Sequence, residues 1–442
     1  MDAVRMLEEL IRFDSANPFV CHETDPEDPA TWKLEGNEIR IAEYLEPLLQ
    51  FAGFTVRRQP VHEGPDGTVY YNLLAEKGLG PASILFYGHM DTVTARPWLS
   101  REQALTPARS IRRIDGMDRE IMTGLGANDM KAGLAAALEA LAPLEPDGWR
   151  IKLAFGVDEE FYSTGGYVLS RSDFIDDVRA VIIPETGDGP NTRHGTGTIT
   201  LGRLGRCECV IDVAGTGGHG AQAHDPALVS AAAETVKIAA RLERLRAEYQ
   251  ERFTFCAEPM PAAEATGEIS GSTFVSRVEA GDGSLSIPSA GRILVSFQLT
   301  PGVTVASRLK LLEDLVAAMY ASGELARVTV SGEFRPVRVS LRQRPTPFNE
   351  AFCTPADHPF TRYVRGVVDE TVGFRAFNMG WSNADENLFA MARPELPILN
   401  LSPRGRDCHK ADEWVELASV HELVRILHAT AVRFGEYLKV SR

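Results

Sequence analysis

Positive charge is scarce in this 442-residue chain, and so are long apolar runs and repetitive segments. The 46 Lys and Arg residues are outnumbered by 61 Asp and Glu, and the resulting net charge of −15 disfavours nucleic acid as a partner. No apolar run is long enough to span a membrane, so a membrane partner is not expected either. Internal repeats and low-complexity tails are absent as well.

Cysteine is also sparse, with six residues in all. Cys207 and Cys209 share one strand pattern and would face the same side, so they cannot easily form a disulfide. No second pair follows at zinc-site spacing, which favours plain thiols over a soft metal site. The N-terminus lacks the basic start, apolar core and cleavage site of a signal peptide. Free thiols without such a signal predict a cytoplasmic protein.

The composition, with 44% hydrophobic and 24% charged residues, is ordinary for a globular protein, and the length suits two domains. The most informative segment is Ile84–Val93. Its apolar run predicts a buried strand that ends at Gly88, followed by His89 and Asp91. Ligands of open α/β sheets bind beyond the carboxyl ends of strands. Alternation places the two side chains together, so one could bind a metal and the other orient it. A strand-end histidine capped by an aspartate is the alternative.

Acidic residues follow other predicted elements in the same way. Asp129 lies in a glycine-rich turn that leads into a strong helix-forming run, where it could also serve as an N-cap. The acids 158–160 follow the apolar strand Ile151–Val157. Adjacent carboxylates there repel one another unless a cation is near, although a solvated acidic turn is possible.

Two further candidates complete the set. Glu185 follows the apolar run Ala180–Pro184, and His409 comes shortly after the strand pattern 397–401. Carboxylate and imidazole ligands in this mixture suit Zn²⁺, Mn²⁺ or Co²⁺. Four carboxylates and two histidines exceed what one tetrahedral ion needs. Two ions that share a bridging carboxylate fit better.

In this order, the motifs resemble the M20 family of dinuclear metallohydrolases, which includes acetylornithine deacetylase, succinyl-diaminopimelate desuccinylase, aminoacylase and glutamate carboxypeptidase. The resemblance covers nearly the whole chain. It implies two divalent ions, with zinc expected and cobalt or manganese as options. The implied ligands are His89 and Glu185 for the first ion, Glu160 and His409 for the second, and Asp129 as the bridge.

The resemblance also implies roles beside the ions. Glu159 would be the general base, and Asp91 would orient His89. The family's bridging aspartate precedes a cis peptide, which here would join Asp129 to Met130.

The order of predicted elements divides the chain into a catalytic domain, 1–203, an inserted lid, 204–337, and the rest of the catalytic domain, 338–442. The fold class is α/β: a zinc-peptidase-like catalytic domain with a ferredoxin-like α+β lid for dimerisation. An acidic, proline-containing loop is expected from Cys21 to Gly36. The lid elements are a strand at 207–213, a helix at 227–249, strands at 267–278 and 292–299, a helix at 305–320 and a strand at 327–334. A final helix is expected over 420–437.

Two histidines occupy the turn between the first strand and helix of the lid. His219 follows glycines, and the resemblance implies that it reaches a neighbouring subunit's active site and stabilises the oxyanion there. A homodimer formed through the lids is therefore expected. His224 matches a less defined family histidine, and a helix-start packing role is favoured for it.

Two departures from the family concern the substrate. Gln298 occupies a lid position where many relatives carry an arginine, and glutamine cannot form a charged bidentate contact with a carboxylate. Asn383 replaces an acid in a segment where Trp381 adds bulk. Gln298 and Asn383 are candidate substrate contacts, while Arg375, Arg404 and Arg406 are possible substitutes for the missing arginine.

These observations predict a metal-dependent hydrolase of the deacylase or carboxypeptidase type, which cleaves an amide or other C–N bond. The expected substrate is a small N-acyl amino compound or dipeptide, attacked by a water between the ions that Glu159 activates. One alternative is an aminohydrolase acting on an amino-aromatic or specialised metabolite. Another is a metal-binding dimeric pseudoenzyme.

Overall fold

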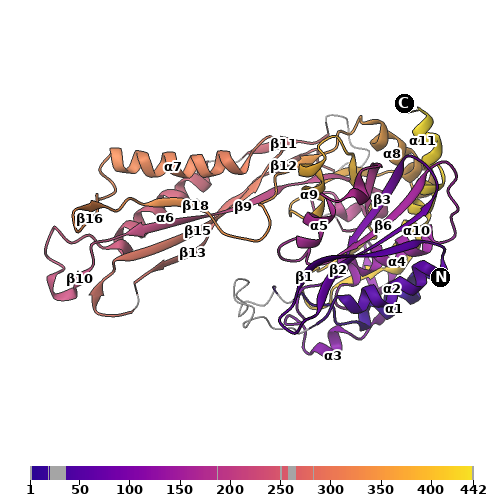
Figure 1. Ribbon diagram of the computed structural model, residues 1–442, viewed down its shortest axis with the longest axis horizontal. Helices are drawn as coiled ribbons and strands as arrows, with labels where there is room; N and C mark the ends of the chain where they lie inside the picture. The colour runs from indigo at the N-terminus through magenta and orange to yellow at the C-terminus, as the bar shows by residue number, and fades with distance from the viewer. Residues whose placement is uncertain are drawn as a thin grey trace.

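The computed structural model describes residues 2–17, 19, 36–186, 188–248, 251–256, 265–281 and 283–440. They form a broad part and a narrower part, arranged along the long axis of the molecule (Figure 1). The broad part contains both ends of the chain, and the narrower part comes from the middle of the sequence. The loop expected from Cys21 to Gly36 lies, apart from Gly36, outside the described residues.

The broad part is built on a mixed nine-stranded sheet with the order β1-β2-β6-β3-β7-β21-β8-β19, in which β20 also pairs with β8. The strands are β1 (Thr55–Glu63), β2 (Val69–Gly78), β3 (Ser83–His89), β6 (Arg150–Gly156), β7 (Val178–Ile183), β8 (Thr198–Arg203), β19 (Phe352–Cys353), β20 (Ala376–Gly380) and β21 (Ile398–Asn400). The neighbours β6, β3, β7 and β21 run parallel. Their carboxyl ends therefore meet at one edge, where ligands bind in such sheets.

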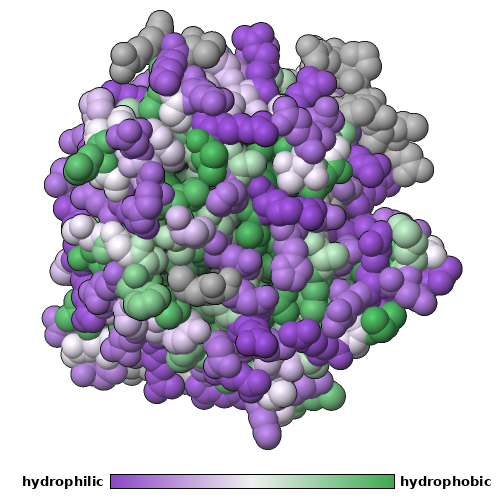
Figure 2. All heavy atoms as spheres, turned by 90° about the vertical axis from the view of Figure 1, so that its right-hand side faces the viewer, coloured by the Kyte–Doolittle hydropathy of each residue, from purple (hydrophilic) through white to green (hydrophobic). Residues whose placement is uncertain are grey.

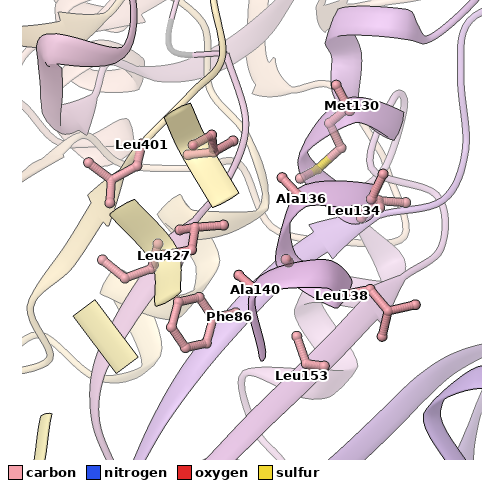
Figure 3. Close-up of a cluster of buried hydrophobic side chains, with 14 of the residues drawn as sticks. Phe86, Met130, Leu134, Ala136, Leu138, Ala140, Leu153, Leu401 and Leu427 are labelled. Atoms are coloured by element: carbon pink, nitrogen blue, oxygen red, sulfur yellow. The ribbon is translucent and has the colours of Figure 1, made fainter. Parts of the chain in front are cut away.

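The centre of this sheet is buried on both faces. All seven residues of β3 are buried, as the continuous apolar run of a covered parallel strand requires. One face is covered by α4 (Ala132–Leu141), an alanine-rich helix that is buried on nearly all sides. Figure 3 shows side chains of α4 gathered with Phe86 of β3, Leu153 of β6 and Leu427 of α10 (Leu417–Val432). This core fixes the start of α4 beside the strand ends.

The other helices of the broad part are α1 (Ala3–Arg12), α2 (Ile39–Phe51), α3 (Arg101–Ala104), α5 (Thr164–Leu169), α8 (Pro359–Val372), α9 (Asp385–Ala392) and α11 (Phe434–Val440). The single helix expected over 420–437 is thus divided between α10 and α11. A smaller antiparallel sheet, β22-β23-β5-β4, joins β4 (Ala108–Ile114), β5 (Met117–Thr123), β22 (Gly405–Arg406) and β23 (Trp414–Glu416). The loop between β22 and β23 carries His409.

The narrower part has the expected ferredoxin-like arrangement, with an antiparallel sheet in the order β13-β15-β9-β18. Its elements are β9 (Gly205–Ala214), α6 (Ala231–Glu248), β13 (Thr273–Ala280), β15 (Ala290–Leu299), α7 (Val305–Ala321) and β18 (Arg338–Leu341). Cys207 and Cys209 of β9 are buried with Ile238 of α6 and Leu312 of α7, so both helices cover the same face. All five described cysteines are free thiols.

Two strand predictions in this part are wrong in detail. Residues 327–334 do not supply the fourth strand, because they contain the short hairpin of β16 (Thr329–Val330) and β17 (Glu333–Phe334). The fourth strand is β18, which pairs with β9 and lies entirely beyond residue 337. The strand expected over 267–278 is divided into β12 (Glu268–Ser270), which pairs with β11 (Arg252–Thr254), and β13.

The surface of the broad part is mostly polar where it faces away from the narrower part. Figure 2 shows hydrophilic residues predominating on this face, with hydrophobic residues scattered among them. Among the described residues, no helix combines the length and apolarity needed to cross a membrane.

Candidate active site

The fold brings the five expected metal-binding residues together at the edge of the large sheet. They form two groups that share Asp129: His89, Asp129 and Glu185 in the first, and Asp129, Glu160 and His409 in the second. Within each group the candidate ligand atoms lie within 4.8 Å of one another. Ligand atoms around a tetrahedral zinc ion are roughly 3.3 Å apart, so small movements would close each group around one ion.

Asp129 faces both histidines with different oxygens. His89 Nε2 lies 3.2 Å from Oδ1 of Asp129, and His409 Nε2 lies 3.3 Å from Oδ2. His409 Nε2 also lies 3.1 Å from Oε2 of Glu160, whose other oxygen is buried without a hydrogen-bond partner. A buried oxygen of this kind is costly unless something binds it. The donor set therefore fits two divalent ions with Asp129 between them.

The turn that carries Asp129 is shaped by close packing. It is a kinked turn, Ala127–Lys131, in which Asp129 and Met130 have non-helical φ and ψ, and it leads directly into α4. Gly126 before it has φ +74°, a left-handed conformation that favours glycine. The Asp129–Met130 peptide is cis, as the resemblance implied. A Cβ on Gly133 of α4 would lie 1.7 Å from the carbonyl oxygen of Pro184, so the start of α4, directly after the turn, sits against the residue that joins β7 to Glu185.

Asp91 connects the end of β3 with the acidic turn after β6. His89 Nδ1 lies 3.0 Å from the backbone oxygen of Asp91 and 3.4 Å from its carboxylate, a geometry that fixes the imidazole. The same carboxylate accepts hydrogen bonds from the backbone N–H groups of Glu159, at 3.1 Å, and Glu160, at 3.0 Å. Asn17 donates to it at 2.8 Å. One buried carboxylate thus orients a histidine and two neighbouring glutamates.

Glu159 projects toward the two groups. Its Oε2 lies 4.0 Å from His89 Nε2, and 12% of its side chain is exposed. Burial raises the pKa of Glu159, and the nearby carboxylates of Glu185 and Asp385 raise it further, while the charge of His89 opposes them. A carboxylate with a raised pKa is suited to accept a proton and later release it.

The surrounding acids attract positive charge. Burial raises the pKa of Glu185 to about 8, with Glu386 adding to the effect and Arg203 opposing it. Hydrogen bonds to Asp129 and Glu160 raise the pKa of His409 to about 12. Buried carboxylates that share a site are stabilised by a neighbouring cation, and bound divalent ions would supply that charge.

Two charged residues beside the site had no predicted role. Arg203, at the end of β8, is buried and places Nη2 2.5 Å from Oε1 of Glu185 while it also pairs with Glu386. Glu413 is buried and accepts hydrogen bonds from the Asp129 turn. Two features of the sequence could have indicated these residues. Arg203 ends an apolar strand, and Glu413 is an acid four residues after His409.

The family model "Peptidase family M20/M25/M40" matches residues 85–433, most of the chain. The chain belongs to this family. A succinyl-diaminopimelate desuccinylase of Rhodopseudomonas palustris is 26% identical over 396 residues, covering 88% of this chain and 92% of that protein. One from Rhizorhabdus wittichii is 32% identical over 196 residues, covering 42% of this chain and 48% of its own length. The chain thus spans about half the length of this more similar relative.

The fold is shared with solved structures. Aminopeptidase PepT from Bacillus cereus superposes with a TM-score of 0.66 at 16% sequence identity, and the match covers 97% of this chain and 96% of PepT. At this identity the likeness shows the fold alone. It agrees with the expected α/β architecture of an M20 protein.

The lid histidines of this M20 chain lie far from the ligand groups. His219 belongs to β10 (Gly218–His219), which pairs with β14 (Ser286–Ile287) at the left end of the molecule in Figure 1, opposite the sheet that carries His89. His219 is exposed, and its Nδ1 accepts a hydrogen bond from the N–H of Ala221. His224 is also exposed. A single chain therefore does not bring His219 into its own candidate site.

Gln298 and Asn383, the expected substrate contacts, lie where the narrower part meets the broad part. Gln298 of β15 donates from Nε2 to the backbone oxygen of Trp381 at 3.0 Å and accepts a hydrogen bond from Ser272 Oγ at 2.5 Å. Its amide is therefore engaged by the protein at both ends. Asn383 is half-buried in the loop that begins at Trp381.

The alternative arginines lie elsewhere. Arg375 and Arg404 line a cavity of about 290 Å³ that none of the five candidate ligands lines. Arg404 pairs with Asp115, and Arg406 is exposed on β22.

Proposed function

We propose that the chain is a hydrolase that cleaves the amide bond of a small N-acyl amino compound or dipeptide with the help of two divalent ions. The observation that carries the proposal is the pair of ligand groups sharing Asp129, with the Glu159 carboxylate 4.0 Å from His89. Membership of the M20/M25/M40 peptidase family supports amide hydrolysis as the reaction.

His89 and Glu185 would hold one ion and Glu160 and His409 the other, with Asp129 between them. Bound ions would polarise the substrate carbonyl and make a water easier to deprotonate. Glu159 accepts a proton from that water while the oxygen of the water attacks the carbonyl carbon. It then delivers the proton to the nitrogen as the C–N bond breaks, so that an acid and an amine leave.

His219 completes the proposal from a second chain. Its place at the far end of the lid suits a residue that reaches a partner's site, where it would donate a hydrogen bond to the oxyanion. We therefore propose a homodimer formed through the lids.

The metal part of the proposal is tested by elemental analysis. Zinc suits the mixture of two imidazoles and three carboxylates, with cobalt and manganese as alternatives. Two ions per chain are expected in the wild type, and Asp129→Ala is expected to lose both because each group uses this carboxylate. Retention of two ions by the folded variant would exclude the bridge.

The substrate is tested by mass spectrometry with enzyme loaded with Zn²⁺, Mn²⁺ or Co²⁺. N-succinyl amino acids belong in the first panel because the curated relatives are named succinyl-diaminopimelate desuccinylases. Other N-acyl amino acids and dipeptides follow, because Gln298 occupies a position where many relatives carry an arginine. Two bound ions with no turnover across the panel would favour the metal-binding pseudoenzyme instead.

A further inference from the structure

Glu413 stands out as a buried carboxylate that lies beside the candidate metal site without belonging to either ligand group. It is 1% exposed and immediately precedes β23, four residues after His409. Pairing of β23 with β5 brings it next to the chain segment that follows β5, which is the glycine-rich turn leading to Asp129. Residues almost 290 positions apart in sequence are thereby in direct contact.

The Glu413 carboxylate is occupied entirely by backbone N–H groups of this turn. Oε2 accepts from Gly126 at 2.9 Å, and Oε1 accepts from Asn128 at 2.8 Å and from Asp129 at 2.9 Å. The backbone oxygen of Glu413 accepts a fourth hydrogen bond, from Gly124, at 3.1 Å. The side chain therefore accepts three hydrogen bonds from the turn, one of them from the N–H of Asp129, the residue that both ligand groups share.

These donors need such an acceptor. N–H groups at the start of a helix have no partner within the helix, and here Gly126 and Asn128 are buried and Asp129 is half-buried at the entrance to α4. Gly126 adopts a left-handed conformation and Asp129 has non-helical φ and ψ, so the turn is not held by helical hydrogen bonding alone. A carboxylate is also the favourable charge at a helix N-terminus. Without it, these three donors would lose their acceptor.

We propose that Glu413 is a positioning residue for the metal centre: by holding the turn that presents Asp129, it sets the affinity for both ions without touching either. The inference rests on the proposed two-ion site. The loop that carries His409 is tied to the same turn, since Asn128 Nδ2 donates to Cys408 Sγ at 3.2 Å. Glu413 thus couples the bridging carboxylate to the loop of a second ligand.

The test compares Glu413→Gln with wild type in metal titrations. Metal-free protein is titrated with Zn²⁺ in competition with a chromophoric chelator, and thermal unfolding of the metal-free protein is measured in parallel. Glutamine keeps the shape but turns an NH₂ group toward backbone donors, so fewer of the three N–H groups find an acceptor. Residues that orient metal ligands typically contribute 10- to 100-fold in affinity, and we expect both ions to bind 10- to 100-fold more weakly.

Glu234→Gln is the matched control. Glu234 is a buried glutamate of α6 in the lid, and it accepts a backbone hydrogen bond from Ala326 at 2.9 Å. Like Glu413 it is a buried carboxylate that accepts a backbone hydrogen bond, although it also pairs with Lys237, and it does not contact the ligand turn. We expect Glu234→Gln to bind both ions with wild-type affinity, even if its unfolding temperature falls.

The outcomes separate this inference from the proposed function. A wild type that binds no ions refutes the two-ion site itself. A wild type that binds two ions, together with a folded Glu413→Gln that binds both equally tightly, refutes the role of Glu413 alone. If Glu413→Gln does not fold, Glu413→Asp is measured in the same way, because it retains a carboxylate within reach of fewer donors. Failure of both variants to fold would show a requirement for folding itself and overturn the positioning role.

Discussion

Replacing Gly133 with alanine tests how tightly the start of α4 is packed against the end of β7. The added Cβ would lie 1.7 Å from the carbonyl oxygen of Pro184, whereas real Cβ atoms essentially never come within 3.0 Å of such a neighbour. The two backbones must therefore separate by about 1.3 Å. Because the obstacle is a backbone atom, no side-chain rotation can relieve it.

The expected magnitude follows from two opposing effects. Overpacking costs about 1–3 kcal/mol, and a rigid backbone obstacle belongs at the upper end. Alanine in place of glycine within a helix returns about 1 kcal/mol. We expect Gly133→Ala to lower the free energy of unfolding by about 1–2 kcal/mol. Glu185 follows Pro184 directly, so the same displacement should weaken binding of the first ion.

Gly366→Ala is the matched control, measured by urea unfolding of the metal-free proteins followed by circular dichroism. Gly366 lies within α8, and a Cβ there would meet no atom within 4 Å. We expect this variant to gain about 0.5–1 kcal/mol, since helix propensity acts without a clash. The two substitutions should therefore have opposite signs. If Gly133→Ala is as stable as Gly366→Ala, the close approach of α4 to β7 is refuted.

Three further predictions concern the chemistry of the site, the lid and the response to pH. Glu159→Gln should retain both ions but lose about 10²- to 10⁴-fold in kcat, which elemental analysis and steady-state kinetics would check; wild-type turnover would remove Glu159 from the mechanism. His219→Ala should fold, bind metal and lose roughly 10²- to 10³-fold in rate, measured by the same kinetics. Burial lowers the pKa of His62 to about 4 from 6.5, so between these values the unfolded chain binds a proton that the folded chain does not. The contribution of His62 to the free energy of unfolding should therefore become less favourable as pH decreases through this window, by up to about 3 kcal/mol. Urea unfolding at several pH values should show this change as the difference between wild type and His62→Phe, and a difference that does not vary with pH would contradict the assignment.

The sequence predicted best those elements whose pattern is set by burial alone. β3 reads as a continuous apolar run, and β6 and β7 read as apolar runs that Lys152 and Arg179 interrupt, because the centre of the sheet is covered on both faces. The polar residues that follow these strands meet at one edge. Any sequence that ends several such strands in His, Asp or Glu brings those side chains together. This pattern indicated a shared site for His89, Glu160 and Glu185, which end or follow β3, β6 and β7. The division into two ligand groups that include Asp129 and His409 came from the family resemblance, because neither residue ends one of these strands.

The misplaced lid strand shows where local pattern fails. Residues 327–334 alternate like a strand, but Ser331 and Gly332 both have positive φ and fold the segment into a hairpin. The true edge strand, β18, offers only two apolar residues and is mostly exposed, so its own pattern is weak. It is defined by pairing with β9, which is a property of the sheet and not of the segment.

The contacts that support the site could not be predicted from local sequence either, because they also depend on strand pairing. Glu413 meets the Asp129 turn because β23 pairs with β5, and Arg203 meets Glu185 because β8 lies beyond β21 in the sheet. Each contact depends on which strands become neighbours. Whether a charged residue near an apolar run is buried can be predicted only when the order of strands in the sheet is known.

The geometry of the lid makes the role of His219 a question about two chains. Arg203 contacts Glu185, and β9 leaves this point at Gly205 and extends ten residues away before the turn that leads to His219. At about 3.3 Å per residue, that strand alone spans roughly 30 Å, and the short segment beyond it cannot return. A His219→Ala chain mixed with a Glu159→Gln chain should therefore regain activity, because one site in the mixed dimer would combine both intact residues. If subunit exchange is verified and no activity returns, His219 does not act across subunits, and it works within its own chain or not at all.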